Sequence, residues 1–326
     1  MKPKVFITRY IPGDAIPRLK KLFEVKVNPK DEVISRQELL KGVKWCDALL
    51  CLLTEKIDKE VIDANPKLRV ISNYAVGFNN IDVEYATKKR IPVCNTPSQE
   101  VNDAVAEHAL ALLLGIAKRI HEDEIYVREH KWKSWAPELL LGTQIKGKTL
   151  GIVGLGRIGS GVAERARGFG LKIIYSDVKK NLEFEKQFQA QYYSLNDLLK
   201  TADFVTLHVP LLPSTHHLIS TKQFSLMKKT AYIINTSRGP VIDEKALVQA
   251  LQKRKIAGAG IDVHETEPSV DHPLHKLKNC ILTPHTASAT IEVRLQMGKD
   301  AADNIIAILQ GKQAPKTVNP DVYGKR

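Results

Sequence analysis

Three residues with anion-binding, acid and base chemistry each stand just past a separate apolar run. They are Arg238, Glu267 and His285. Because the carboxyl ends of parallel strands face the ligand crevice of an open α/β sheet, we expect a cation, a carboxylate and an imidazole to converge there. The preceding runs are residues 232–237, 260–264 and 280–284.

This set could reduce a 2-keto acid. Arg238 can bind the substrate carboxylate and carbonyl oxygen through its fork of donors. His285 can donate a proton to that oxygen while a hydride reaches the carbon, and Glu267 can orient His285 and favour its charged form. Each residue alone has a plainer explanation, as a surface ion pair, a loop acid or a turn histidine. Three on successive strand ends favour catalysis.

The elements that must position this set include a nucleotide-binding turn. An apolar run at 149–153 leads directly into Gly154-x-Gly156-x-x-Gly159. The first glycine permits the turn, the second lets backbone N–H groups approach a pyrophosphate, and the third lets the next helix pack on the strand. The pyrophosphate would lie at that helix N-terminus. The alternative is that the glycines serve only turns and packing.

An acid follows at the spacing that this fingerprint expects. Asp177 stands about 20 residues downstream, after the apolar run 171–175. A carboxylate there accepts hydrogen bonds from ribose hydroxyls and repels a 2′-phosphate, so the sequence predicts NAD(H) rather than NADP(H). Lys179 and Lys180 leave NADP(H) as the alternative.

Apolar runs alternate with helix-like segments along the chain. This rhythm predicts an α/β protein with two doubly wound parallel-sheet domains, a flavodoxin-like substrate domain and a Rossmann NAD domain. We expect the substrate domain at residues 1–98, completed by 289–326, and the dinucleotide-binding domain inserted at 99–288. Helices are expected at 101–120 and 292–309. The expected strands are 5–8, 25–28, 48–53, 68–72 and 92–95, then six more at 150–153, 173–175, 204–209, 232–235, 260–263 and 281–283.

Composition narrows the class of protein. The chain has 326 residues, 43% of them hydrophobic, which is enough for a core in each of two domains. Its longest apolar stretch, 109–117, is too short for a membrane span, and the N-terminus lacks a signal-peptide pattern, so we expect a cytoplasmic protein. The formal net charge of +13 is spread along the chain, which argues against nucleic-acid binding.

Neither the cysteines nor the other histidines predict a metal site. The four cysteines lack zinc-like spacing, and the pair His216-His217 has no acid or cysteine at metal spacing. We expect reduced, buried thiols. Four further histidines have no setting comparable with that of His285, and we assign them no role: His108, His208, His264 and His275.

From about residue 45 to about residue 310 the chain resembles the D-isomer-specific 2-hydroxyacid dehydrogenase family. The matching segments are NYAVGFNNID at 73–82, the glycine fingerprint, NTSRG at 235–239, GIDVHETEP at 260–268 and TPHTASA at 283–289. The resemblance implies that Arg238, Glu267 and His285 are catalytic and that the backbone N–H groups of Val76 and Gly77 grip the substrate carboxylate. It also implies a homodimer built around the nucleotide domain. The cofactor contacts that it implies are Val105, Arg157, Ile158, Pro210, Thr215, Thr236 and Asp262.

Within that family the nearest resemblance is to glyoxylate/hydroxypyruvate reductases. It rests on the segment that begins at Tyr74, on Trp132 and Trp135, and on Ser288, which could touch a substrate hydroxyl. Leu53, with Tyr74 and the two tryptophans, would shape the substrate pocket. The family pattern usually has Phe at position 264 and Ile-Gly at 286–287, where this chain has His and Thr-Ala.

The leading hypothesis is therefore an NADH-dependent reductase of small 2-keto acids, glyoxylate and hydroxypyruvate first. A D-lactate-type or 2-ketogluconate-type dehydrogenase is the alternative within the same chemistry. The alternative from another class is a non-catalytic NAD(H)-sensing protein resembling C-terminal binding protein corepressors, which retain the same three residues. A compact chain with no disordered tail argues against that alternative.

Overall fold

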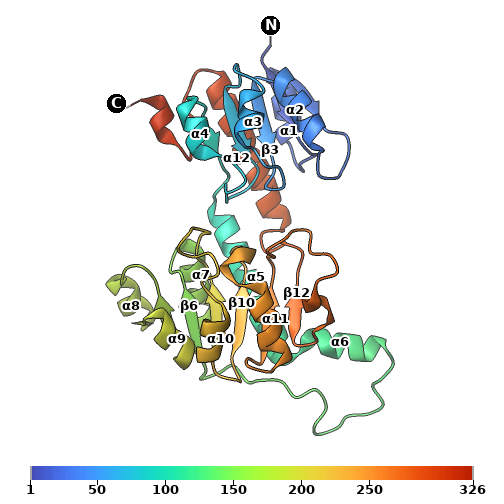
Figure 1. The fold of residues 1–326 in the computed structure, drawn as a ribbon, viewed down its shortest axis with the longest axis vertical. Coiled ribbons are helices and arrows are strands. Elements are labelled where there is room, and N and C mark those ends of the chain that lie inside the picture. Colours follow the sequence, from blue (N-terminus) through green and yellow to red (C-terminus); the bar gives the residue numbers. More distant parts are fainter. Residues whose placement is uncertain (1, 325–326) are drawn as a thin grey trace. The chain divides into compact units, whose positions relative to one another are not determined.

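A computed structural model describes residues 2–324 of the chain. The chain divides into two compact units (Figure 1). Unit 1 comprises Met1–Val101 and Ala289–Arg326, and unit 2 comprises Asn102–Ser288. Each unit is built on its own parallel sheet.

Unit 1 contains five strands in the order β2-β1-β3-β4-β5, all parallel. This is the flavodoxin-like order. The strands are β1 (Lys4–Ile7), β2 (Glu24–Val27), β3 (Ala48–Cys51), β4 (Val70–Asn73) and β5 (Val93–Cys94). Its helices are α1 (Ala15–Leu22), α2 (Arg36–Trp45), α3 (Lys59–Asp63), α4 (Val83–Lys88) and α12 (Ile291–Leu309), with a 3₁₀ turn at η3 (Pro320–Tyr323).

Helices cover both faces of the unit 1 sheet. Residues of α2, α3 and α4 share one buried apolar cluster with the strands. Helices α1 and α12 pack together, and α12 packs on β4, where Ser72 Oγ donates a hydrogen bond of 3.1 Å to the Ala301 carbonyl. Because both faces are covered, all four residues of β3 are buried, as expected of a parallel strand. The C-terminal helix therefore completes the N-terminal unit.

Unit 2 contains seven parallel strands in the order β12-β11-β10-β9-β6-β7-β8. The first strand of the unit, β6, lies between β7 and β9, which is the strand arrangement of a dinucleotide-binding sheet. The strands are β6 (Thr149–Val153), β7 (Lys172–Ser176), β8 (Gln191–Tyr192), β9 (Phe204–Leu207), β10 (Tyr232–Asn235), β11 (Gly258–Ile261) and β12 (Cys280–Leu282).

The prediction of six strands in this unit is wrong by one edge strand. β8 has only two residues and pairs with β7 through Ile174 and Tyr175. A run this short carries no alternating pattern that sequence reading could detect. The prediction of an α/β protein with two parallel sheets is confirmed.

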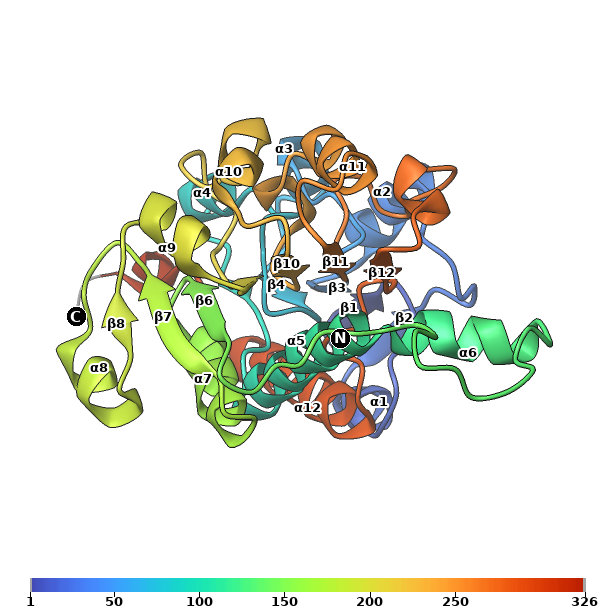
Figure 2. The ribbon, with the colours of Figure 1, turned by 90° about the horizontal axis from the view of Figure 1, so that it is seen from below.

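Helices also cover both faces of the unit 2 sheet (Figure 2). One face carries α9 (Leu195–Thr201), α10 (Thr221–Leu226) and α11 (Glu244–Gln252). The other carries α5 (Gln99–Lys118), whose residues from 102 onward belong to this unit, with α7 (Arg157–Gly168) and α8 (Leu182–Phe188). The remaining elements are α6 (Ile120–Arg128), η1 (Gly239–Val241) and η2 (Pro273–Lys276).

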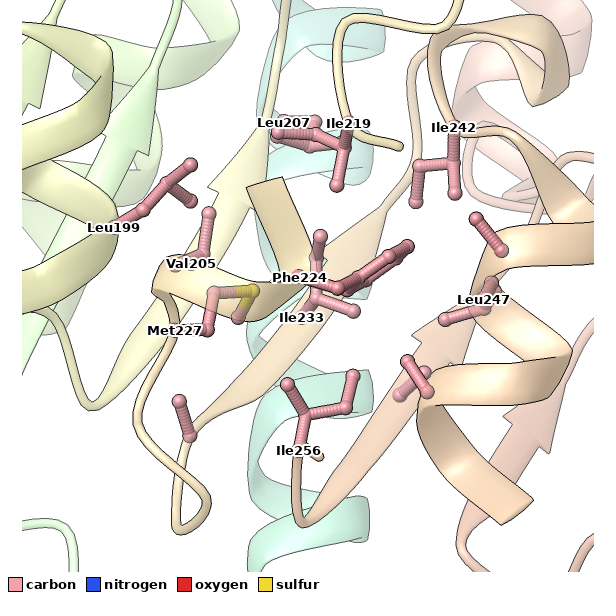
Figure 3. Close-up of a cluster of buried hydrophobic side chains, with 14 of the residues drawn as sticks. Leu199, Val205, Leu207, Ile219, Phe224, Met227, Ile233, Ile242, Leu247 and Ile256 are labelled. Atoms are coloured by element: carbon pink, nitrogen blue, oxygen red, sulfur yellow. The ribbon is translucent and has the colours of Figure 1, made fainter. Parts of the chain in front are cut away.

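The core under α10 and α11 illustrates what holds the sheet rigid. Phe224 of α10 is buried among side chains from the sheet and α11, including Ile233 and Leu247 (Figure 3). Replacing a buried phenylalanine by alanine typically costs about 3–5 kcal/mol of unfolding free energy. This packing fixes the strand ends from which the candidate site residues project.

No helix among residues 2–324 is long and apolar enough to cross a membrane. The four cysteines are buried and unpaired, as expected. The cytoplasmic location stays a prediction.

Candidate active site

The three strands that precede the predicted catalytic residues are neighbours in the unit 2 sheet and end level with one another. Asn235 of β10 pairs with Ile261 of β11, and Ile261 pairs with Leu282 of β12. The loops that carry Arg238, Glu267 and His285 therefore leave the same edge of the sheet.

Arg238 is held by a turn that its own neighbours build. Asn235 Oδ1 accepts hydrogen bonds from Ser237 N (3.0 Å) and Ser237 Oγ (2.8 Å), and Asn235 Nδ2 donates to the Arg238 carbonyl at 3.0 Å. The guanidinium donates to the Ser237 carbonyl at 2.7 Å. Burial lowers the pKa of Arg238, and the negative charge of Glu267 acts against that shift. The site thus holds a desolvated cation close enough to feel the Glu267 carboxylate.

Gly239 allows the Arg238 turn to approach the loop after β11. A Cβ atom built on Gly239 would lie 1.9 Å from the carbonyl carbon of His264 and 2.4 Å from Glu265 N. No side chain fits between two backbones at that distance. The glycine after Arg238 is therefore required for the two loops to meet.

Glu267 and His285 form a close pair. Glu267 Oε2 lies 2.7 Å from His285 Nδ1, and Glu267 Oε1 accepts a hydrogen bond from His264 N at 3.0 Å. Burial alone would raise the pKa of Glu267, but the His285 hydrogen bond, the His264 N–H and the charges of both imidazoles outweigh it and hold that pKa below its usual range. Because Nδ1 is bound to the carboxylate, Nε2 of His285 is the ring nitrogen left to exchange a proton with a substrate.

The loop that carries His285 is braced by a buried carboxylate. His285 adopts a left-handed backbone conformation (φ 55°), and its N–H donates to the Asp262 carbonyl at 2.8 Å. Asp262 Oδ1 accepts from Thr283 Oγ1 (2.6 Å) and Thr286 N (2.8 Å), while Oδ2 accepts from Ala287 N (2.9 Å). The resemblance implied a cofactor contact for Asp262. Both of its oxygens accept hydrogen bonds from the loop that carries His285, a role that the sequence did not predict.

Glu267 and His285 border a small pocket within unit 2. Its volume is about 290 Å³, and His264, His275 and the residues around Pro268 and Pro284 line it together with the pair. Glu267 and His285 are thus accessible to a small molecule.

The glycine-rich turn fits a dinucleotide. Gly154 has a φ of +93°, and a Cβ there would lie 2.8 Å from the His208 carbonyl, while a Cβ on Gly159 would lie 2.2 Å from the Gly154 oxygen. A Cβ on Gly156 would meet nothing within 4 Å. Gly156 caps α7 without a side-chain hydrogen bond, so the first N–H groups of that helix, at Arg157 and Ile158, can bind phosphate.

Asp177 lies beside this turn at the end of β7. Its Oδ2 accepts a hydrogen bond from Leu155 N and its Oδ1 from Val178 N, each at 2.6 Å. The carboxylate is therefore attached to the glycine-rich turn itself. Lys179 and Lys180 are both exposed, and Lys180 Nζ lies 5.3 Å from the centre of the Tyr192 ring.

The other implied cofactor residues of unit 2 lie on three elements. Val105 is buried in α5. Thr215 Oγ1 donates to the Pro210 carbonyl at 2.6 Å and so closes the loop after β9. Thr236, directly after β10, has a buried hydroxyl without a hydrogen-bond partner among the described residues. An unsatisfied buried hydroxyl at this sheet edge is consistent with a polar ligand there.

The implied substrate residues lie apart from these in the sequence, mostly in unit 1. The Val76 carbonyl accepts from Asn95 Nδ2 at 2.7 Å, and the Gly77 carbonyl accepts from Asn73 Nδ2 at 2.9 Å, so amide side chains fix this turn. Tyr74 is buried, and its hydroxyl donates to the Arg294 carbonyl at 2.7 Å. The positions of the remaining residues are simpler: Leu53 is exposed and Ser288 is half-buried at the end of unit 2.

The two tryptophans that are predicted to shape the substrate pocket lie in the segment after α6. Trp132 is 60% exposed and Trp135 is 81% exposed. Their role in the substrate pocket stays a prediction.

Three of the histidines to which the sequence assigned no role lie beside residues of the candidate site. His108 Nε2 lies 3.1 Å from Thr283 Oγ1 and 3.5 Å from Asp262 Oδ1, and His275 lines the pocket. His264 contacts Glu267 through its backbone and Glu244 through its ring. Only His264 carried a sequence signal, since it lies in the same loop as Glu267. No group of three or more potential ligand side chains in residues 2–324 is arranged to hold a metal ion.

Known proteins are similar to this chain in sequence and in fold. Residues 110–287 match the family described as D-isomer specific 2-hydroxyacid dehydrogenase, NAD binding domain. The chain is 48% identical over 328 residues to a glyoxylate reductase of Korarchaeum cryptofilum, covering 100% of this chain and 98% of that one. Among solved structures, a protein from Thermus thermophilus is similar with a TM-score of 0.92 and 40% identity, covering 97% of this chain and 99% of that one.

A second structural relative carries a cofactor. It is an NADPH-dependent glyoxylate/hydroxypyruvate reductase from Sinorhizobium meliloti, in complex with NADP and malonate. It has a TM-score of 0.84 and 28% identity, and the similarity covers 98% of each chain. This chain is thus similar in structure to a protein that holds a nicotinamide dinucleotide.

Proposed function

This chain belongs to the D-isomer-specific 2-hydroxyacid dehydrogenase family and is an oxidoreductase that uses a nicotinamide cofactor, and from that premise we propose that it reduces glyoxylate and hydroxypyruvate to the corresponding 2-hydroxy acids. The observation that carries the proposal is the 2.7 Å pair of Glu267 and His285 on the sheet edge that also carries Arg238. It provides a proton donor beside an anion-binding cation.

His285 is the residue that transfers the proton. A bound nicotinamide cofactor supplies the hydride that reaches the substrate carbon. Protonated His285 donates from Nε2 to the carbonyl oxygen, and the product is the hydroxyl compound. His285 then recovers its proton from solvent. In the reverse direction the neutral ring accepts the hydroxyl proton.

Arg238 orients the substrate and stabilises the oxygen as negative charge develops on it. A planar guanidinium can hold the carboxylate and the carbonyl oxygen together, and desolvation strengthens that interaction. We propose that unit 1 is the substrate domain, where the backbone N–H groups of Val76 and Gly77 bind the carboxylate. Leu53, Tyr74 and Ser288 are the proposed contacts to the rest of the substrate.

We propose that NADH is preferred over NADPH. Asp177 accepts one backbone hydrogen bond from Leu155 in the glycine-rich turn and one from its own neighbour Val178, so a 2′-phosphate would meet a negative charge held in place. Replacing Asp177→Ala should narrow the ratio of kcat/KM for the two cofactors. Equal use of both by the unmodified protein would contradict the proposal, and Lys179→Ala would then test whether that exposed lysine binds the phosphate.

A panel of 2-keto acids, followed by loss of NADH absorbance, tests the substrate. Glyoxylate and hydroxypyruvate should give the highest kcat/KM. A higher value for pyruvate would favour a D-lactate-type enzyme, and one for a sugar-derived keto acid would favour a 2-ketogluconate-type enzyme. No turnover, together with tight NADH binding, would favour a cofactor-sensing protein.

We also propose that the chain forms a homodimer through unit 2. Exposed apolar side chains gather on α6 and the segment after it, which is unusual for a free surface. They are Ile120, Ile125, Val127, Trp132, Trp135 and Leu141. Light scattering after size-exclusion chromatography should give twice the 36.4 kDa chain mass. A mass of one chain at micromolar concentration would contradict this assembly.

A further inference from the structure

A second carboxylate lies behind the catalytic pair, between two histidines. Glu244 begins α11 and is only 6% exposed. Its Oε1 lies 3.4 Å from His264 Nδ1, and its Oε2 lies 3.5 Å from His272 Nε2. These distances are ion-pair contacts, and Glu244 Oε1 and His264 Nδ1 make no aligned hydrogen bond.

His264 connects this carboxylate to Glu267. Its backbone N–H donates to Glu267 Oε1, and the residue is buried where its ring interacts with the charges of both glutamates. The close approach of Gly239 to the His264 carbonyl fixes this residue from the other side. The His264 backbone is therefore packed against the Arg238 turn.

The surroundings of His264 favour its charged form. Glu244 is the largest influence raising the pKa of His264, burial acts against it, and Glu267 and the Thr283 backbone add to the increase. For Glu244, burial would raise the pKa, but His264, a hydrogen bond from the Glu265 backbone and the charge of His272 lower it overall. A buried carboxylate without a partner would be costly, so a cation beside it is the consistent state.

We propose that His264 is a positively charged positioning residue whose imidazolium holds Glu267 ionised and sets the pH range in which the Glu267–His285 pair can donate a proton. This inference rests on the proposed reductase function. In this proposal His264 touches neither substrate nor cofactor, and it acts only through Glu267.

Other charged and titratable groups also face this pair of glutamates. Glu267 faces Arg238 and His285 besides His264. Glu244 faces His272 and the buried thiol of Cys280, whose pKa burial raises to about 12. Beyond them, Glu265 Oε1 accepts from Glu244 N at 3.3 Å and lies 2.7 Å from His217 Nε2.

The variant His264→Phe removes the imidazolium charge and puts another aromatic ring in its place. Loss of a positive charge makes each neighbouring acid hold its proton more tightly. We expect both limbs of the pH profile of kcat/KM for keto-acid reduction to move to higher pH, by roughly half to one unit. His264→Gln, which is neutral but polar, should shift the profile in the same direction.

His272→Phe is the matched control. It removes the other histidine from the same glutamate, but His272 is not among the groups that shift Glu267. Its profile should move much less than that of His264→Phe. If kcat/KM fell equally at every pH in both His264 variants, with unmoved limbs, His264 would serve packing alone and the proposal would be overturned.

A measurement on the unmodified protein needs neither a folded variant nor turnover. Ring-labelled histidine followed by NMR should show His264 still protonated above the ordinary histidine pKa of about 6.5. A neutral His264 ring at that pH would overturn the inference. Absence of keto-acid reduction in a protein whose His264 is protonated would contradict the proposed function and leave the charged His264 intact.

Discussion

Two loops at the carboxyl edges of the sheets, the turn after β4 in unit 1 and the loop after β12 in unit 2, are held by different chemistry. In unit 1, neutral amides hold the turn after β4: Asn73 Nδ2 donates to the Gly77 carbonyl, Asn95 Nδ2 to the Val76 carbonyl, and Asn80 Nδ2 to the carbonyls of Leu52 and Glu55. In unit 2, charged side chains hold the loop after β12: Asp262 braces it, and Glu267 binds His285. The contrast applies to these two loops, because the Asn235 amide holds the Arg238 turn of unit 2 and the buried Glu55 carboxylate binds Leu52 N in unit 1.

This difference indicates a division of labour. Amides orient backbone groups without adding charge, which suits a surface that binds a substrate equally well before and during the reaction. Buried charges stabilise a proton donor and a developing negative charge, which matters most in the transition state. Damage to the unit 1 turn should therefore raise KM, and damage to the unit 2 edge should lower kcat.

The largest loss is expected from His285→Gln, which removes the proton donor but keeps a polar side chain. Positioned acid catalysis typically contributes about 10²- to 10⁴-fold, so kcat for reduction should fall by that range. His275→Gln is the control, since His275 lines the same pocket but pairs with Ser269. A fall of less than about tenfold for His285→Gln would assign the proton to another group.

A smaller but still severe loss is expected from Arg238→Lys. An ammonium keeps the charge but not the planar two-point grip, and kcat/KM should fall at least about tenfold, or about 1.4 kcal/mol. NADH affinity should change far less. Arg167→Lys, at an exposed position of α7, controls for the substitution itself. Normal kinetics for Arg238→Lys would remove Arg238 from the site.

A substitution that loosens the unit 1 turn should raise KM. Asn73→Ala deletes donors to Gly77 and Asn80, and we expect KM to rise several-fold with kcat nearly unchanged. Asn65→Ala also deletes a buried amide of unit 1, one that bonds to Val43 and Cys46 outside this turn. Both variants should lose about 1–3 kcal/mol of unfolding free energy, but only Asn73→Ala should change KM. Equal KM values for Asn73→Ala and Asn65→Ala would contradict a substrate-binding role for the turn after β4.

The sequence predicted those features that depend on local pattern. The apolar runs at 232–235, 260–263 and 281–283 predicted that the three site residues share one sheet edge, because parallel strands all run the same way. The glycine-rich turn was predictable because strand, glycines and helix follow one another directly in the chain.

The features that sequence reading missed depend on residues far apart in the chain. Glu244 lies on the helix after β10 and His264 follows β11, and neither residue alone predicts that they meet. The brace by Asp262 was hidden for a similar reason, since its partners begin at Thr283. The approach of Gly239 to His264 is a backbone contact that no side-chain pattern records. Such contacts are set by how loops pack after the sheet has formed.

In the proposed mechanism Glu267 controls the proton held by His285, and the pH profile of Glu267→Gln is the sharpest test of that coupling. The amide keeps the shape of the side chain but lacks its charge, so the imidazolium loses stabilisation and releases its proton at lower pH. We predict that the alkaline limb of kcat/KM for keto-acid reduction moves toward acid, and that hydroxy-acid oxidation, which needs the neutral ring, begins to rise at lower pH. Limbs that stay where they are in both directions would contradict the coupling of Glu267 to His285 and, with it, the proposed mechanism.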